Sequence, residues 1–476
     1  MLFNSFEYLI FLPLVFIFYW KVLNKNLKVQ NFFILSVSYL FYGWWDWRFL
    51  FLLCFSSLID FFIGILISNT DIDKKRKFLL GISIFMNLSI LGFFKYFNFF
   101  VDSFVEFSEL FGFKANKSSL NIILPVGISF YTFQILSYTI DVYRKKLTAT
   151  KDVISFMAFV SFFPQLVAGP VERAVNLLPQ FFKNRTFDLQ SAKDGLRQML
   201  WGLFKKIVIA DTCAVYVKDI FDNYDTYNSG TLFFGIIFFA FQIYCDFSGY
   251  SDIAIGTARL FGFKLMKNFA FPYFSRGIVE YWRRWHISLS TWFRDYLYIP
   301  LGGSRCSKFK QIRNIVITFT ISGLWHGANW NYIFWGFTNG LLFIPSIIFK
   351  KKSETEVVAQ NRILPSLKEI LQLFITFWSI NFTVVFFRSA SFSDALHYFE
   401  RMFTTNFFDF PDLLNFSFIW ILVLFVAEWF QRTKEHAMQI ENLPRIVRWL
   451  IYYVLAIVVF YFFNYNSGQS FVYFQF

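Results

Sequence analysis

The sequence predicts an all-α protein that crosses a membrane many times. Hydrophobic residues make up 56% of its 476 residues, aromatic residues 24% and charged residues 16%, which is far from the composition of a soluble globular protein. The apolar runs, rich in Phe, are long enough for roughly ten or more spans of about 20 residues each. Nothing resembling a separate soluble domain interrupts them. We therefore predict one multi-span membrane domain over residues 1–476.

The distribution of basic residues predicts how the chain threads the bilayer. The net charge is +14, but Lys and Arg occur in short clusters between apolar runs, which indicates topology and argues against a nucleic-acid partner. Basic clusters at residues 21–28, 74–77 and 144–151 follow one span and then two pairs of spans. Because basic loops face the cytoplasm, we expect the N-terminus outside. The same alternation, continued to a last span at residues 449–463, places the C-terminus outside.

Three parts of this domain differ in character. Residues 1–150 contain N-terminal spans, including apolar runs at 31–43, 49–68, 78–94 and 122–140. Residues 151–350 carry Gly, Pro and polar residues inside apolar runs, as in F-F-P-Q-L-V-A-G-P-V-E-R at 162–173. Such a segment predicts a broken helix, which either lines a wet cavity or is an ordinary kink. We interpret residues 151–350 as the core of the domain.

The C-terminal part, residues 351–476, is predicted to hold further spans and a tail. Spans are expected near residues 367–387 and 416–430. Between them we predict an outer loop that carries Asp394, Glu400, Asp409 and Asp412. We expect His397 in that loop and His436 in a basic inner loop to be solvated.

One histidine stands in an unusually apolar stretch. His326 lies in S-G-L-W-H-G-A-N-W at residues 322–330, and apolar sequence continues on both sides. An ionisable group held in a bilayer or a deep core is costly, which makes it a candidate functional residue. The alternative is a core histidine whose ring bonds a backbone carbonyl, but these surroundings favour a site.

Two carboxylates interrupt another apolar stretch, Q-I-Y-C-D-F-S-G-Y-S-D-I-A-I-G at residues 242–256. Asp246 and Asp252 are six residues apart, which is about 240° around a helix at 100° per residue. They therefore do not share a face as an acid/base pair does. We interpret one or both as hydrogen-bonding struts, with a direct chemical role as the alternative.

The segment at residues 281–305 is predicted to be one amphipathic helix that Pro300 and Gly302 close. Its apolar stripe, at spacings of three and four, consists of Trp282, Trp285, Leu289, Trp292 and Tyr296. The polar stripe beside it consists of Arg283, His286, Ser290 and Arg294. An interfacial membrane anchor explains Trp and Arg equally well, but a second histidine on the polar stripe favours a site.

Several other classes of protein lack their motifs here. The four cysteines, Cys54, Cys213, Cys245 and Cys306, are far apart and have no nearby histidine at metal-ligand spacing. We interpret them as free thiols and expect no metal site. A Walker loop, a G-x-S-x-G elbow and an H-E-x-x-H motif are absent from the sequence, which argues against ATP-driven pumps and zinc proteases.

Taken in order, the blocks at residues 162–170, 242–252, 281–305 and 322–330 resemble the membrane-bound O-acyltransferase (MBOAT) superfamily, most closely its branch of alginate and peptidoglycan O-acetyltransferases. The resemblance covers nearly the whole chain, through F-F-R-S-A-S-F at 386–392 to F-V-Y-F-Q-F at 471–476. It implies a helical bundle with re-entrant or broken helices around a central tunnel. The family's essential histidine corresponds to His326 and its second histidine to His286. Candidates for the tunnel wall are Arg283, Ser290, Arg294, Trp325, Asn329, Asp246 and Asp252.

The resemblance implies an acetyltransferase of the bacterial cytoplasmic (inner) membrane. Acetyl-CoA is then the acyl-donor substrate, no bound cofactor is expected, and the acceptor is a cell-surface polysaccharide such as alginate or peptidoglycan. An imidazole, with its unperturbed pKa of ~6.5, suits the base that such a reaction needs. A cluster of Arg305, Lys308, Lys310 and Arg313 either attracts the CoA phosphates or is simply solvated. A helix from Arg313 to His326 spans ~20 Å, which would place His326 well inside an ~30 Å hydrocarbon core.

A partner is expected to complete the reaction. Residues 1–476 contain no extracytoplasmic domain large enough for a polysaccharide, and the resemblance implies a separately encoded SGNH-type acetyltransferase with a serine, histidine and aspartate site. Tyr473 carries the one hydroxyl in residues 471–476, and it is either a transient acyl carrier or part of an aromatic anchor. Two other functions stay open: D-alanine export to teichoic acids, and non-enzymatic transport of a small solute.

Overall fold

A computed structural model describes residues 1–113, 120–167, 169–349, 356–407 and 417–463. Within these ranges the regular structure is helical, with no β-strand. The stretches long and apolar enough to cross a membrane are Arg48–Ser68, Asp73–Glu109, Ser229–Leu260, Leu367–Arg388 and Arg445–Phe462. Two shorter apolar helical stretches are Val153–Leu166 and Phe418–Phe430. The predicted all-α class with several membrane spans is confirmed.

The helices form two compact units. Unit 1 comprises Met1–Ala192 and Ala258–Leu265, and unit 2 comprises Lys193–Thr257 and Met266–Phe476.

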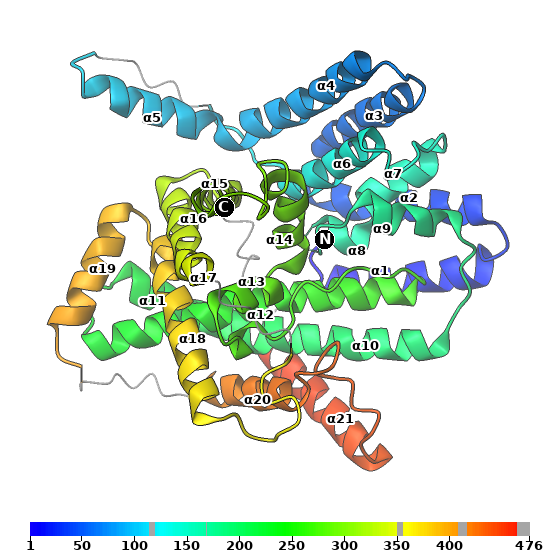
Figure 1. The fold of residues 1–476 in the computed structure, drawn as a ribbon. Coiled ribbons are helices and arrows are strands. Elements are labelled where there is room, and N and C mark those ends of the chain that lie inside the picture. The colour runs from blue at the N-terminus through cyan, green and yellow to red at the C-terminus, as the bar shows by residue number, and fades with distance from the viewer. Residues whose placement is uncertain (114–119, 168, 350–355, 408–416, 464–476) are drawn as a thin grey trace. The chain divides into compact units, whose positions relative to one another are not determined.

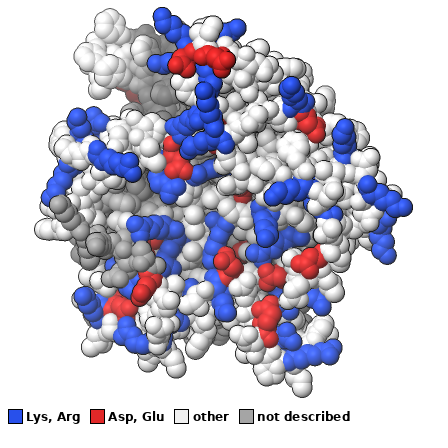
Figure 2. Space-filling view, turned by 45° about the vertical axis from the view of Figure 1, so that its right-hand side comes forward, with Lys and Arg blue, Asp and Glu red and all other residues white. Residues whose placement is uncertain are grey.

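Lys and Arg side chains are spread over the face shown in Figure 2, with fewer Asp and Glu side chains among them. This excess matches the 45 Lys and Arg against 31 Asp and Glu in the sequence.

Unit 1 contains a bundle of apolar helices (Figure 1). Its α-helices are α1 Phe6–Ile17, α2 Leu27–Asp46, α3 Arg48–Ser68, α4 Asp73–Leu91, α5 Phe97–Glu109, α6 Ile128–Tyr143, α7 Val153–Ser161, α8 Phe163–Leu166 and α9 Ala174–Leu177. Helix α6 packs against α3 and α4. Buried Asp60 of α3 accepts hydrogen bonds from Asn87 Nδ2 and Thr139 Oγ1, each at 2.6 Å, and from Ser83 Oγ. One carboxylate thereby joins three helices, since polar groups inside a membrane bundle need such partners.

Two breaks in unit 1 bear on the predictions. The predicted helix break within residues 162–173 is present, because α7 ends at Ser161 and the four-residue α8 follows. The apolar run at 122–140 becomes helical only at Ile128, after Gly127 in the left-handed region at φ 75°. A Cβ at Gly127 would lie 2.6 Å from the carbonyl oxygen of Leu166. Both the backbone angle and the close approach therefore require glycine.

Unit 2 contains the remaining helices (Figure 1). They are α10 Leu189–Leu203, α11 Asp211–Asp222, α12 Ser229–Leu260, α13 Ile278–Arg284, α14 Ile287–Phe293, α15 Lys308–His326, α16 Trp330–Leu342, α17 Ile344–Ile348, α18 Leu367–Arg388, α19 Phe392–Thr404, α20 Ser417–Phe430 and α21 Arg445–Phe462. Two of them cross a unit boundary: α10 belongs to unit 2 from Lys193 onward, and α12 belongs to it up to Thr257. Two π-helical turns, η4 Phe204–Ala210 and η6 Arg294–Tyr298, adjoin α10 and α14.

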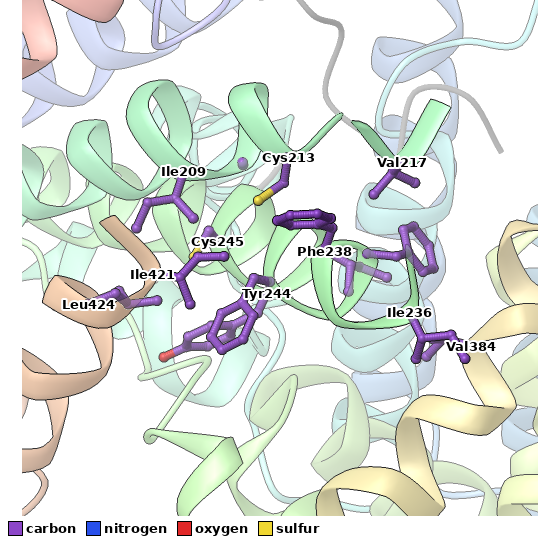
Figure 3. Packing of buried hydrophobic residues seen from close by; sticks show 14 of the residues in the cluster. Ile209, Cys213, Val217, Ile236, Phe238, Tyr244, Cys245, Val384, Ile421 and Leu424 are labelled. Carbon is purple, nitrogen blue, oxygen red and sulfur yellow. The ribbon is translucent and has the colours of Figure 1, made fainter. Parts of the chain in front are cut away.

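The core of unit 2 is a continuous apolar cluster. Figure 3 shows part of it, including Ile209 of η4, Cys213 of α11, Phe238 of α12 and Ile421 of α20. Cys213 and Cys245 are buried in this cluster, and all four cysteines are free. Buried free cysteines behave as small apolar side chains.

Helices α15 and α16 form a tightly packed hairpin, and α18 packs against α16. A Cβ added to Gly336 would lie 3.0 Å from the Gly323 Cα, and one added to Gly323 would clash with the carbonyl oxygen of Tyr332. Small residues allow two helix backbones to approach this closely. The hairpin therefore fixes the end of α15, where His326 lies.

Two predictions about the C-terminal part are wrong. The segment with Asp394 and Glu400 is helix α19 and not a loop, although His397 on it is exposed as expected. His436 is 2% exposed, and its Nε2 lies 3.1 Å from Asp194 Oδ1 of α10. Its burial depends on α10, more than 200 residues earlier in the chain, so the basic residues around it gave no sign of the partner. Asp409 and Asp412 lie outside the described residues.

Candidate active site

His326 is the last residue of α15, which runs without a break from Lys308. The imidazole is 5% exposed and packs edge-on against Trp335 of α16 and Phe387 of α18, at ring-centroid distances of 5.2 and 5.6 Å. The predicted helix from Arg313 to His326 is therefore present. Because three helices contribute to these contacts, packing sets the position of this ring.

The predicted continuous helix at residues 281–305 is wrong. Helix α13 ends at Arg284, α14 begins at Ile287, and His286 between them has a left-handed backbone with φ 43°. The backbone groups at the break are bonded by residues 268–270: Ala270 N–H donates to the Arg284 carbonyl at 2.9 Å, and Ile287 N–H donates to the Asn268 carbonyl at 2.8 Å. A non-glycine residue at positive φ is strained and persists where its surroundings hold it.

The side chain of His286 is buried, with 1% exposure. Its ring lies edge-on to Phe247 of α12 at 4.5 Å, and Nδ1 lies 3.1 Å from Asn268 Oδ1. His286 lies outside the five candidate spans. Burial lowers the pKa of His286 well below its usual value, and the neighbouring His326 lowers the pKa further. His286 is therefore a neutral imidazole near neutral pH.

Both histidines line one pocket of about 690 Å³ in unit 2. Three of the predicted tunnel residues, Arg283, Ser290 and Arg294, share its wall with them. Much of the remaining wall is apolar, including Trp282, Trp285, Leu289 and Phe319. A mostly apolar pocket with a few convergent polar groups is the usual form of a small-molecule site.

The other predicted tunnel residues lie elsewhere. Trp325 packs edge-on against both histidines, with ring-centroid distances of 6.2 Å to His286 and 5.0 Å to His326, but it does not form part of the wall of this pocket. Asn329 is exposed and caps α16 by accepting a hydrogen bond from Asn331 N–H at 3.0 Å. Tyr473 lies outside the described residues.

Asp246 and Asp252 on α12 form ion pairs with adjacent lysines of η4. Asp246 pairs with Lys206 and Asp252 with Lys205, each at 2.7 Å, and Gln198 Nε2 also donates to Asp252 at 2.7 Å. Neither carboxylate is part of the pocket wall. These two lysines were not among the residues predicted from the sequence, although two charges inside the apolar run F-K-K-I-V-I-A at 204–210 are a detectable signal.

The basic cluster lies beside the pocket. Arg305, Lys308, Lys310 and Arg313 are all exposed, while Ser304 and Gln311, close to them in sequence, belong to the pocket wall. A phosphate-bearing ligand approaching the pocket from this side would meet positive charge. Within the part of the chain that the structure describes, no group of three or more His, Cys, Asp or Glu could hold a metal ion.

Asn268 and Ser288 are two further residues of the site that were not predicted from the sequence. Both are fully buried. Asn268 Oδ1 accepts hydrogen bonds from Ser288 Oγ at 2.8 Å and Ser288 N–H at 3.3 Å, and Asn268 Nδ2 donates to Ser251 Oγ at 2.9 Å. Nothing in the sequence around Asn268 signals this role, because its partners lie on separate segments.

Comparison with known proteins agrees with this geometry. Residues 145–389, which include both histidines and the whole pocket wall, match the family described as MBOAT, membrane-bound O-acyltransferase. The chain is 44% identical over 345 residues to the probable alginate O-acetylase AlgI of Pseudomonas putida, covering 72% of this chain and 70% of that protein. It is 33% identical over 424 residues to the peptidoglycan O-acetyltransferase of Helicobacter pylori, covering 83% and 78%.

A more distant similarity connects the chain to another kind of acyl transfer. It is 28% identical over 295 residues to the teichoic acid D-alanyltransferase of Streptococcus thermophilus, covering 57% of this chain and 69% of that protein. The family match over half of the chain and the two closer similarities lead to the same conclusion. The chain belongs to the membrane-bound O-acyltransferase family, and it is a multi-pass membrane O-acyltransferase.

Proposed function

We propose that this enzyme takes acetyl groups from cytoplasmic acetyl-CoA and passes them across the membrane for O-acetylation of a cell-surface polysaccharide. The observation that carries the proposal is the pair of buried histidines on one pocket of about 690 Å³. The similar proteins named for alginate and peptidoglycan O-acetylation support the acetyl group and the class of acceptor. The enzyme then belongs in the bacterial inner membrane with both termini outside, and residues 151–350 form its catalytic core.

In the proposed reaction an acceptor hydroxyl oxygen attacks the thioester carbonyl carbon. His326 takes the hydroxyl proton, the carbon–sulfur bond breaks, and the CoA thiolate leaves and receives a proton. Imidazole is suited to this because its pKa lies close to neutral pH. His286, on the same pocket, supports the reaction.

Charge near the pocket supports the choice of donor. Arg283 and Arg294 lie in the pocket wall, and the four exposed basic residues at 305–313 lie beside it. Guanidinium groups bind phosphate by paired hydrogen bonds, so this side suits the phosphates of acetyl-CoA. Acetyl-CoA is a substrate in this proposal and not a resident cofactor.

A second protein completes the proposed pathway. We propose a separately encoded extracytoplasmic SGNH-type acetyltransferase as the partner, and Tyr473 as the hydroxyl that carries acetyl from the His326 site to it. The Tyr473→Phe variant keeps the aromatic ring and removes only the oxygen. Unchanged polysaccharide acetylation by this variant would leave Tyr473 as an anchor.

Reconstitution tests the proposal. The purified enzyme in vesicles, given labelled acetyl-CoA on the cytoplasmic side, should release CoA and label a polysaccharide only when the partner is added on the other side. His326→Asn should show neither activity. Polysaccharide acetylation without any partner would refute the two-protein scheme. Base-labile acetate in purified wall and in exopolysaccharide, with and without the gene, identifies the polymer.

The alternatives receive less support. D-alanine export predicts a D-alanyl carrier protein as donor, and the similarity to teichoic acid D-alanyltransferase is lower and covers less of the chain. Supplying the two donors separately to the reconstituted enzyme distinguishes them. Non-enzymatic solute transport is set aside because the chain belongs to a family of acyltransferases.

A further inference from the structure

We propose that Asn268 is a positioning residue that fixes the tautomer of His286, with the proton on Nδ1 and the lone pair on Nε2. This inference rests on the proposed function, since it assumes that His286 acts at the pocket. It identifies the nitrogen of the His286 ring that can accept a proton or a hydrogen bond, and the residue that determines this.

Hydrogen-bond directions at Asn268 determine the orientation of its amide. A backbone N–H can only donate, so the Ser288 N–H at 3.3 Å identifies its partner as the Asn268 oxygen, Oδ1. The amide nitrogen, Nδ2, faces Ser251 Oγ at 2.9 Å and donates to it. The hydrogen-bond partners of Asn268 therefore identify which end of its amide is the oxygen and which is the nitrogen.

The same oxygen lies 3.1 Å from His286 Nδ1. An amide oxygen can only accept, so a hydrogen bond at this distance requires that Nδ1 carry the hydrogen. In a neutral imidazole the other nitrogen, Nε2, then holds the lone pair. The ring is therefore fixed in a form whose Nε2 can act as an acceptor, and His286 is one of the residues that line the pocket.

The neutral amide also separates His286 from charged groups. Behind Asn268, a small cavity is lined by several charged or titratable residues: Lys205, Asp252, Lys267, Glu428, Glu435 and His436. The charged or titratable groups that share the pocket wall with His286 are His326 of α15, Arg283 of α13, and Arg294 and Tyr298 of η6. A carboxylate in place of the Asn268 amide would favour the charged imidazolium, so an asparagine is the partner that keeps His286 neutral.

The backbone of Asn268 has a separate task, because its carbonyl accepts the hydrogen bond from Ile287 N–H at the helix break. Side-chain substitutions leave that bond in place. Asn268→Asp keeps the size and the acceptor oxygens while adding a charge. Asn268→Leu keeps approximate size and removes the acceptor.

The test is the pH profile of labelled acetyl transfer by the full-length enzyme in vesicles. Asn268→Asp should move the acid limb to higher pH by ~1 unit or more, because a nearby carboxylate raises the pKa of an imidazole and the neutral form is the active one. Asn268→Leu should lower kcat by about 10-fold or more with little change in KM. The matched control is Asn26→Asp, at an exposed N-cap where aspartate caps equally well, and its profile should be that of the wild type.

The outcomes separate the inference from the proposed function. No acetyl-CoA turnover by the wild type overturns both, whereas full activity in His286→Ala overturns the inference and leaves the proposed function standing. Impaired His286→Ala together with a wild-type profile in Asn268→Asp, or a wild-type kcat in Asn268→Leu, overturns the tautomer assignment alone. If the Asn268 variants do not fold, Ser251→Ala and Ser288→Ala, which remove hydrogen bonds from either end of the amide, carry the test. Unchanged kcat in both overturns the assignment.

Discussion

Two histidines face one pocket, but different forces hold them. His326 ends the regular helix α15, whose close packing on α16 and whose aromatic neighbours Trp335 and Phe387 set the ring. His286 interrupts its helix, and backbone and amide hydrogen bonds from residues 268–270 hold it. Aromatic packing surrounds both rings, since Phe247 lies 4.5 Å from His286, but only at His286 do matched donors and acceptors from residues 268–270 also fix the backbone and the ring. Changes in volume should therefore affect His326 most, and lost polar partners should affect His286 most.

The largest effect is expected at the packed histidine. His326→Ala should reduce acetyl transfer by ~100-fold or more, since it removes the proposed general base, while the protein still folds. Initial rates with labelled acetyl-CoA measure the loss, and gel filtration with a thermal melt checks folding. More than about a tenth of the wild-type rate would exceed what loss of a general base leaves and would assign the base elsewhere.

At the hydrogen-bonded histidine the loss should be smaller. His286→Ala removes a supporting group but keeps the Cβ, and so the strain, at the backbone position with φ 43°. Because the backbone hydrogen bonds at the helix break remain, we expect the rate to fall by ~10-fold or more with folding preserved. Comparing kcat and KM shows whether chemistry or binding is affected. A loss as complete as that of His326→Ala would mean that the two residues act as one unit.

Packing around His326 can be tested without changing a polar side chain. In Gly323→Ala the new methyl would clash with the Tyr332 carbonyl oxygen, and overpacking of this kind costs ~1–3 kcal/mol. We expect a lower melting temperature and a lower rate, because the end of α15 must shift. Gly81→Ala in α4, where a Cβ meets nothing within 4 Å, is the control and should be neutral or slightly stabilising. Equal melting temperatures for both variants would contradict the packing argument.

The difference between the two histidines also explains what the sequence could predict. The apolar runs predicted spans, and the helix to His326 followed from an unbroken run after Arg313. The break at His286 was not predictable from periodicity, since Trp282, Trp285 and Leu289 keep helical spacing across it. It depends on backbone hydrogen bonds from residues 268–270, which leave no pattern in the sequence. The same holds for Asn268 itself, while the buried lysines at 205–206 did leave a detectable signal.

A third histidine provides the comparison with the smallest expected effect on activity. His436 Nδ1 accepts a hydrogen bond from Met438 N–H at 3.3 Å. The ring hydrogen is therefore on Nε2, which donates a hydrogen bond to Asp194 Oδ1 at 3.1 Å. This is the opposite tautomer to the one proposed for His286. Neither His436 nor Asp194 lines the pocket. Asp194→Leu should destabilise the protein by ~1–3 kcal/mol, because it leaves a buried donor without its partner, while kcat stays at the wild-type value. Thermal melts and initial rates on the same preparation measure both. A fall in kcat with no change in melting temperature would show that this bonded histidine, remote from the pocket in sequence, also takes part in the reaction.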